Sequence, residues 1–155
     1  MPSGVAALFR AVITGTDFEP SNRMLEDLTE EQASFVIEGA PYSIAKLVAH
    51  LCWWQDLSLE RLEGKGGLQK FSMDEQWPEA PYGRWKDLVR HYLDGESRAL
   101  AFAETIDLDA LAPTGETNET VLQRLVLHNI YHLGQIALLR QVRGLWPVAG
   151  GDDLW

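Results

Sequence analysis

Residues 117–142 read TNETVLQRLVLHNIYHLGQIALLRQV and predict one long amphipathic helix. Thr117 or Asn118 can cap its N-terminus, and Gly144 and Pro147 beyond its other end are stop signals. One face carries apolar residues and two histidines at helical spacing: Val121, Leu125, His128, His132, Ile136 and Leu139. His128 and His132 are one turn apart, with a rise of about 6 Å and an angular offset of about 40°. Two such imidazoles can share one metal ion, but they leave its coordination incomplete.

Three further long helices are expected upstream. The first follows Ser3 and ends at Gly15, and the others span about residues 43–63 and 84–105. Two short helical pieces are expected between the first two, one after Pro20 and one opened by a capping box at residues 29–32. No alternating strand pattern is present. The sequence therefore predicts an all-α fold, a four-helix bundle in a single domain over residues 1–155.

The connection from Gly64 to Gly83 is long for a compact domain and rich in glycine and proline. Its length allows the chain to run back along the preceding helix, which is roughly 30 Å long at 1.5 Å per residue. The helices on either side can then be parallel. A second hypothesis is that this connection forms a flap over a functional site.

Composition narrows the class of partner. The chain has 23 acidic and 13 basic residues and a net charge of −10, so no nucleic-acid partner is expected. The only cysteine, Cys52, excludes an internal disulfide and fits a cytoplasmic location. No apolar run approaches the length of about 18 residues that spans a membrane, and no signal-peptide pattern is present.

Three of the four histidines fall on apolar helix faces. His50 shares a stripe with Leu47, Trp54 and Leu57, whereas His91 is expected to be solvated or peripheral. The ordinary interpretation of one such histidine is a buried neutral ring that is satisfied by a backbone carbonyl. Three polar rings in one small core are less easily given separate hydrogen-bond partners, and one shared metal ion would supply a partner for all three.

Several neighbours of these histidines are further candidates. Asn129 and Gln135 could orient the imidazoles, although an ordinary polar role on the helix flank is an equal alternative. Gly134 is expected to make a close packing contact beside His132, because glycine costs about 1 kcal/mol inside a helix. Packing roles are expected for Cys52, Trp53, Trp54 and Tyr131, with one tryptophan a candidate to line a pocket. Asp152 and Asp153 are expected to be solvated.

The sequence resembles the DinB/YfiT-like superfamily. The resemblance rests on APYSIAKLVAH at residues 40–50, AHLCWWQ at residues 49–55 and HNIYHLGQI at residues 128–136. It implies an up-down-down-up bundle with a long crossover between its second and third helices. It also implies a divalent metal ion, nickel or zinc, held by His50, His128 and His132. A homodimer is suggested by the resemblance and by the six tryptophans.

Activities in this family differ between branches. Some members resemble thiol-dependent transferases that use a low-molecular-weight thiol, and others are described as metal-dependent hydrolases. The first hypothesis is therefore a metal-dependent enzyme that acts on a small-molecule substrate. The alternative is a non-catalytic stress-response protein that binds a metal or ligand. A metal site with a face open to substrate would favour the enzyme.

Overall fold

The structure is a computed structural model that describes residues 3–148 and 150. It contains helices and no strand within that part of the chain, which confirms the all-α prediction. The predicted tail residues Asp152 and Asp153 lie outside the described residues. The helices are α1 Gly4–Thr14, α2 Ser21–Glu26, α3 Glu30–Ser34, α4 Ile44–Leu62, α5 Met73–Gln76, α6 Trp85–Thr105 and α7 Asn118–Val142.

Side-chain caps fix where α1, α3, α4, α5 and α7 begin. The hydroxyl groups of Ser3, Ser43 and Thr117 accept hydrogen bonds from backbone N–H groups three residues later, at the start of α1, α4 and α7. Thr29 and Gln32 form the expected reciprocal capping box of α3. Local sequence therefore sets the N-terminal boundaries of α4 and α7, which carry His50, His128 and His132.

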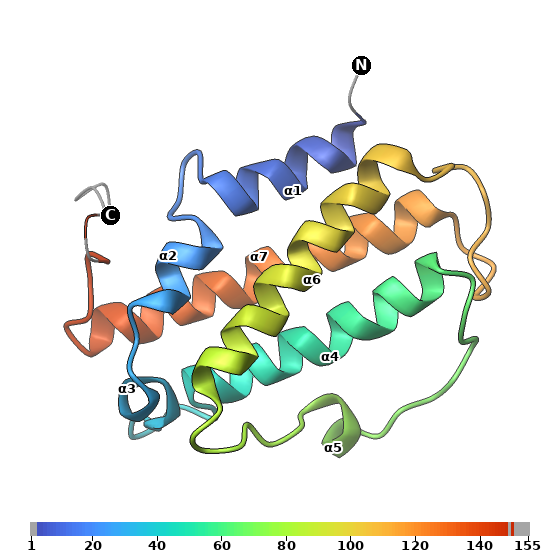
Figure 1. Cartoon of the computed structure of the whole chain (residues 1–155). Coiled ribbons are helices and arrows are strands. Elements are labelled where there is room, and N and C mark those ends of the chain that lie inside the picture. Colours follow the sequence, from blue (N-terminus) through green and yellow to red (C-terminus); the bar gives the residue numbers. More distant parts are fainter. Residues whose placement is uncertain (1–2, 149, 151–155) are drawn as a thin grey trace.

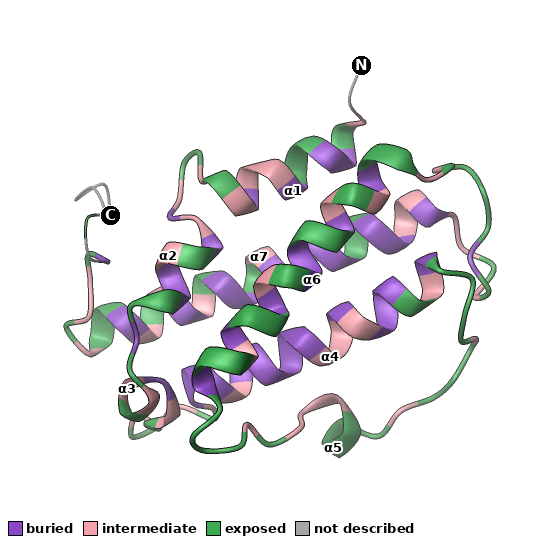
Figure 2. Cartoon of the chain, in the orientation of Figure 1, coloured by how far each residue is buried: buried purple, intermediate pink, exposed green. Residues whose placement is uncertain are grey.

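Four long helices form the body of the molecule (Figure 1). Helices α4 and α6 run in one direction, and α1 and α7 run in the other (Figure 1). Helix α4 packs against α6 and α7, and α1 packs against the same two helices. Buried residues lie on the inward faces of these four helices, and α5 in the crossover carries none (Figure 2).

The crossover between α4 and α6 returns along α4 and carries the short helix α5 (Figure 1). This path allows α4 and α6 to be parallel neighbours, as the length of the connection predicted. Helix α5 is not among the helices expected from the sequence, although Ser72 and Glu75 form a capping box that marks its start. No helix in the described residues is long and apolar enough to cross a membrane.

Buried polar contacts join the helices at specific points. The Arg140 guanidinium, near the end of α7, donates to both carboxylate oxygens of Asp27 at 2.7 and 2.9 Å. Inside the bundle, Tyr92 and Ser21 donate hydrogen bonds to Glu96, which is 1% exposed. Burial raises the pKa of Glu96 to about 7, although both hydrogen bonds oppose that shift.

Candidate metal centre

The three predicted ligands converge from two helices. His50 comes from the middle of α4, and His128 and His132 come from successive turns of α7. The Nε2 atom of His128 lies 3.2 Å from Nε2 of His50 and 3.1 Å from Nε2 of His132. One ligand atom from each residue can be chosen so that all three lie within 4.8 Å of one another. The fold thus brings together residues that are 78 positions apart in the sequence.

The two separations from His128 Nε2 match those around one shared divalent ion. With metal–nitrogen distances of about 2.0–2.1 Å, two nitrogens are about 3.3 Å apart in a tetrahedral site and about 2.9 Å apart in an octahedral one. The observed 3.1 and 3.2 Å lie between these two values. Neutral imidazole is a suitable ligand for both zinc and nickel, so the donor set does not select between them.

Hydrogen bonds at Nδ1 set the tautomers of two ligands. His50 Nδ1–H donates to the Gln76 carbonyl oxygen at 2.5 Å, and His132 Nδ1–H donates to Gln135 Oε1 at 2.6 Å. The proton on Nδ1 leaves each Nε2 with a free lone pair, and both lone pairs face His128 Nε2. The Nε2 atom of His128 can carry only one proton, so as a hydrogen-bond donor it satisfies only one of these two lone pairs. A cation between the three nitrogens would satisfy them all.

The electrostatic environment keeps the ligands neutral. Burial lowers the pKa of His128 to about 4, and the charges of His132 and His50 act in the same direction. Burial also lowers the pKa values of His50 and His132, although the hydrogen bonds to Gln76 and Gln135 partly oppose it. Neutral imidazoles at pH 7 are the form that binds a metal.

The crossover covers one side of the histidines. The Trp77 ring stacks on the His50 ring with a centroid distance of 3.7 Å and an interplanar angle of 5°. The Trp77 ring also stacks against the Tyr42 ring, with a centroid distance of 3.9 Å. Gln76, just before Trp77, supplies the carbonyl that orients His50. The segment predicted as a flap therefore contributes directly to the site through Gln76 and Trp77, neither of which was predicted as a site residue.

A cavity of about 780 Å³ opens beside the histidines. Residues of α4, α7 and the two long connections line it: His50, Trp54, Ser58, Arg61, Leu68, Gln76, Thr114, Glu116, Val121, Arg124, Leu125 and His128. Its volume falls within the range of small-molecule sites. Trp54 is thus the tryptophan that lines a pocket, and its ring meets His128 edge-on at 5.8 Å.

Other predicted neighbours divide into confirmed and corrected roles. Gln135 is a hydrogen-bond partner of His132, but the buried Asn129 side chain makes no hydrogen bond to any described residue. The predicted packing contact at Gly134 is wrong, because Gly134 is exposed and a Cβ there would meet nothing within 4 Å. Tyr131 is 64% exposed, with its ring edge-on to His132, and is therefore not a core residue.

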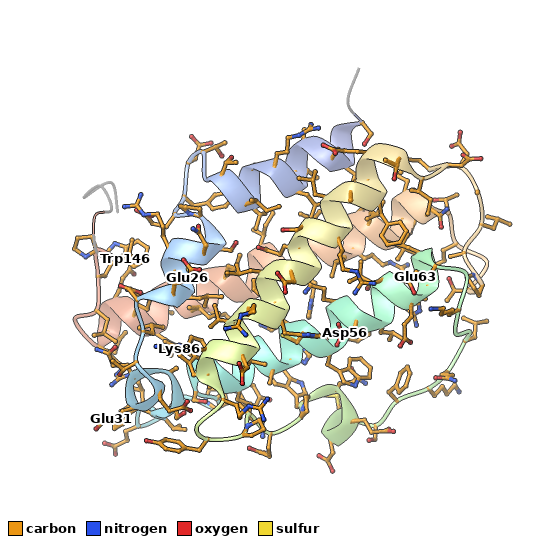
Figure 3. The ribbon with its side chains drawn as sticks, viewed as in Figure 1. Glu26, Glu31, Asp56, Glu63, Lys86 and Trp146 are labelled. Carbon is orange, nitrogen blue, oxygen red and sulfur yellow. The ribbon has the colours of Figure 1, made fainter. Side chains whose placement is uncertain are left out.

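Cys52 and His91 lie outside the triad, as expected. Cys52 is buried, and its thiol faces the Leu88 carbonyl oxygen at 3.8 Å on the side of α6. Burial raises its pKa above the ordinary range of a cysteine. His91 is exposed and pairs with Asp56, which lies on α4 where that helix faces α6 (Figure 3). Neither residue is a candidate ligand.

Comparison with known proteins agrees with these features. The sequence matches the family model of the DinB superfamily over residues 20–136, a segment that includes α4, α6 and the three predicted ligands His50, His128 and His132. No curated protein and no solved structure gives a significant match. The matched segment covers well over half of the 155 residues, and the chain therefore belongs to the DinB superfamily.

Proposed function

We propose that this protein is a metal-dependent enzyme that uses a divalent ion, nickel or zinc, held by His50, His128 and His132. The observation that supports the proposal is the convergence of three imidazoles, two of which, His50 and His128, line a cavity large enough for a small molecule. Within the described residues, this group of potential ligands contains three histidines and no fourth residue. Catalytic zinc sites have three protein ligands and an open position, whereas structural sites are closed by four.

A divalent ion at this position would supply Lewis-acid chemistry to a substrate oxygen, a water or a thiol. The surrounding residues have separate roles in the proposal. Gln76 and Gln135 hold the imidazoles in one tautomer, and Trp54 and Trp77 provide an apolar wall that limits water. Cys52 is buried on the other side of α4 with a raised pKa, so the nucleophile is an external thiol or water. The reaction class is accordingly a thiol-dependent S-transfer or a hydrolysis.

The ligand assignment is tested by elemental analysis of protein purified without an affinity tag. We expect His50→Ala, His128→Ala and His132→Ala each to lower the metal content sharply. His91→Ala is the matched control, because His91 is exposed and lies on α6. Equal metal content in all four variants would refute the triad.

The reaction class is tested by assays with and without a low-molecular-weight thiol. Chelation should abolish turnover, and Cys52→Ser should retain it. Turnover of an ester or amide at a rate that added thiol leaves unchanged would reject S-transfer in favour of hydrolysis. Bound metal with no turnover of any thiol, ester or amide substrate would favour the non-catalytic alternative.

A further inference from the structure

The cavity beside the triad extends along α4 and α7 toward one end of the bundle. On α4 its lining residues are His50, Trp54, Ser58 and Arg61, which follow one helical face at intervals of four, four and three residues. Eleven residues of helix correspond to about 16 Å between the His50 and Arg61 positions along the axis. Helix α7 runs the opposite way (Figure 1), so Val121 and Arg124 lie toward the same end as Arg61. The cavity is therefore elongated, with His50 and His128 at one end.

The chemistry of the lining changes along this length. Between the two ends the lining is largely apolar, with Trp54 and Leu125 nearer the histidines and Val121 nearer Arg61. Leu68 from the crossover also lines the cavity and is 84% exposed, which is unusual for a large apolar side chain. At the far end the lining contains two guanidinium groups, although the chain as a whole has a net charge of −10.

Arg61 is the cation at this end whose charge has no internal partner. Arg124 forms an ion pair with Glu116, the one carboxylate that lines the cavity. Glu63, at the C-terminal end of α4 (Figure 3), is paired with Lys65 and Arg98 instead of Arg61. No ion pair among the described residues includes Arg61, and its Nε is buried without a hydrogen-bond partner.

A second polar atom at the same end is also without a partner. Thr114, in the connection before α7, lines the cavity, and its Oγ1 is buried with no hydrogen bond to the described residues. Buried polar atoms without partners cost free energy, and native proteins contain few of them. A guanidinium and a hydroxyl that line one cavity together form a suitable site for an anion.

We infer that this cavity binds an elongated, apolar small molecule that carries a carboxylate. Arg61 and Thr114 bind the carboxylate, Trp54, Val121 and Leu125 contact the apolar body, and the opposite end reaches the histidines. A single uncompensated guanidinium suits a monoanion, whereas a phosphate dianion would need more positive charge than Arg61 supplies. This inference rests on the proposed function, for which it names the substrate class.

The test is isothermal titration calorimetry of the full chain equilibrated with zinc. Octanoate and 1-octanol have the same apolar body and differ in charge, so their affinity ratio reports the acid site. We expect octanoate to bind wild type at least about tenfold more tightly, the range of a charge-assisted hydrogen bond. Arg61→Gln should remove this preference and leave the octanol affinity unchanged, which also shows that the variant is folded. Arg90→Gln, an exposed position on α6, is the control for the change in net charge.

Equal affinities of octanoate and octanol for wild type would overturn the inference. An equal effect of Arg61→Gln and Arg90→Gln would overturn it as well. The triad is probed separately with 8-mercaptooctanoate, whose thiol should add affinity over octanoate in wild type and add none in His132→Ala. If octanoate is preferred through Arg61 but neither zinc nor the thiol has any effect, the acid site stands and the proposed metal-dependent function fails.

Discussion

Gly95 and Gly134 both lie in the interior of long helices, and the structure predicts opposite effects for the same substitution. Gly95 is buried in α6, and a Cβ at this position would lie 1.9 Å from Nε2 and 2.5 Å from Cδ of Gln55. Gly134 is exposed in α7, and a Cβ there would meet nothing within 4 Å. Helix propensity alone favours alanine at both positions by about 1 kcal/mol.

The cost at Gly95 follows from what Gln55 must give up. Its side chain is fully buried, and its Nε2 donates to the Tyr92 carbonyl oxygen at 2.9 Å. Overpacking costs about 1–3 kcal/mol, and a buried amide that loses its partner costs about 1–3 kcal/mol more. Alanine recovers about 1 kcal/mol through its higher helix propensity. The free energy of unfolding of Gly95→Ala should therefore fall by about 3 kcal/mol, and by at least about 1 kcal/mol. Gly134→Ala should instead raise the free energy of unfolding by about 0.5–1 kcal/mol.

Urea unfolding of the two variants and wild type measures both effects. For a chain of this length, each kcal/mol corresponds to a Tm change of about 2–4 °C. Gln55→Ala should partly rescue Gly95→Ala, because the smaller side chain leaves room for the new methyl group. A stabilised Gly95→Ala variant, or additive losses in the double variant, would refute the proposed contact between Gly95 and Gln55.

Two further predictions concern the metal centre and the interior. Gln135→Leu removes the acceptor of His132 Nδ1–H, so zinc affinity measured by chelator competition should fall about 10- to 100-fold. The exposed Gln123→Leu on the same helix should leave the affinity unchanged, and similar losses in both variants would contradict the orienting role of Gln135. The folded pKa of Glu96 is raised to about 7 from 4.5, so its contribution to stability is present below about pH 4.5 and is lost as the pH rises through 7. Between pH 5 and 8, the free energy of unfolding measured with urea should fall by about 2 kcal/mol less in Glu96→Gln than in wild type. Identical pH profiles of the two proteins would show that Glu96 titrates normally.

The sequence by itself determined the four long helices and the two histidines that share one of them. Helix periodicity and side-chain caps are local properties, and Thr29 with Gln32 forms the capping box that their spacing predicts. His128 and His132 lie on one face because four residues make about one turn. Adding His50 to this pair required the shared apolar faces and the family resemblance, since His50 and His128 are 78 positions apart.

Tertiary structure decided which neighbours complete the site. The carbonyl of Gln76 and the ring of Trp77 reach His50 only because the crossover returns along α4. The sequence shows that each glycine inside a helix lowers helix stability, but only the structure shows which one makes a close packing contact. That contact is between Gly95 and Gln55, and Gly134 makes none with the described residues. A helical period specifies the face on which a residue lies, whereas the element that packs against that face depends on the path of the whole chain. Tyr131 is exposed for the same reason, because its face of α7 is directed away from the bundle interior.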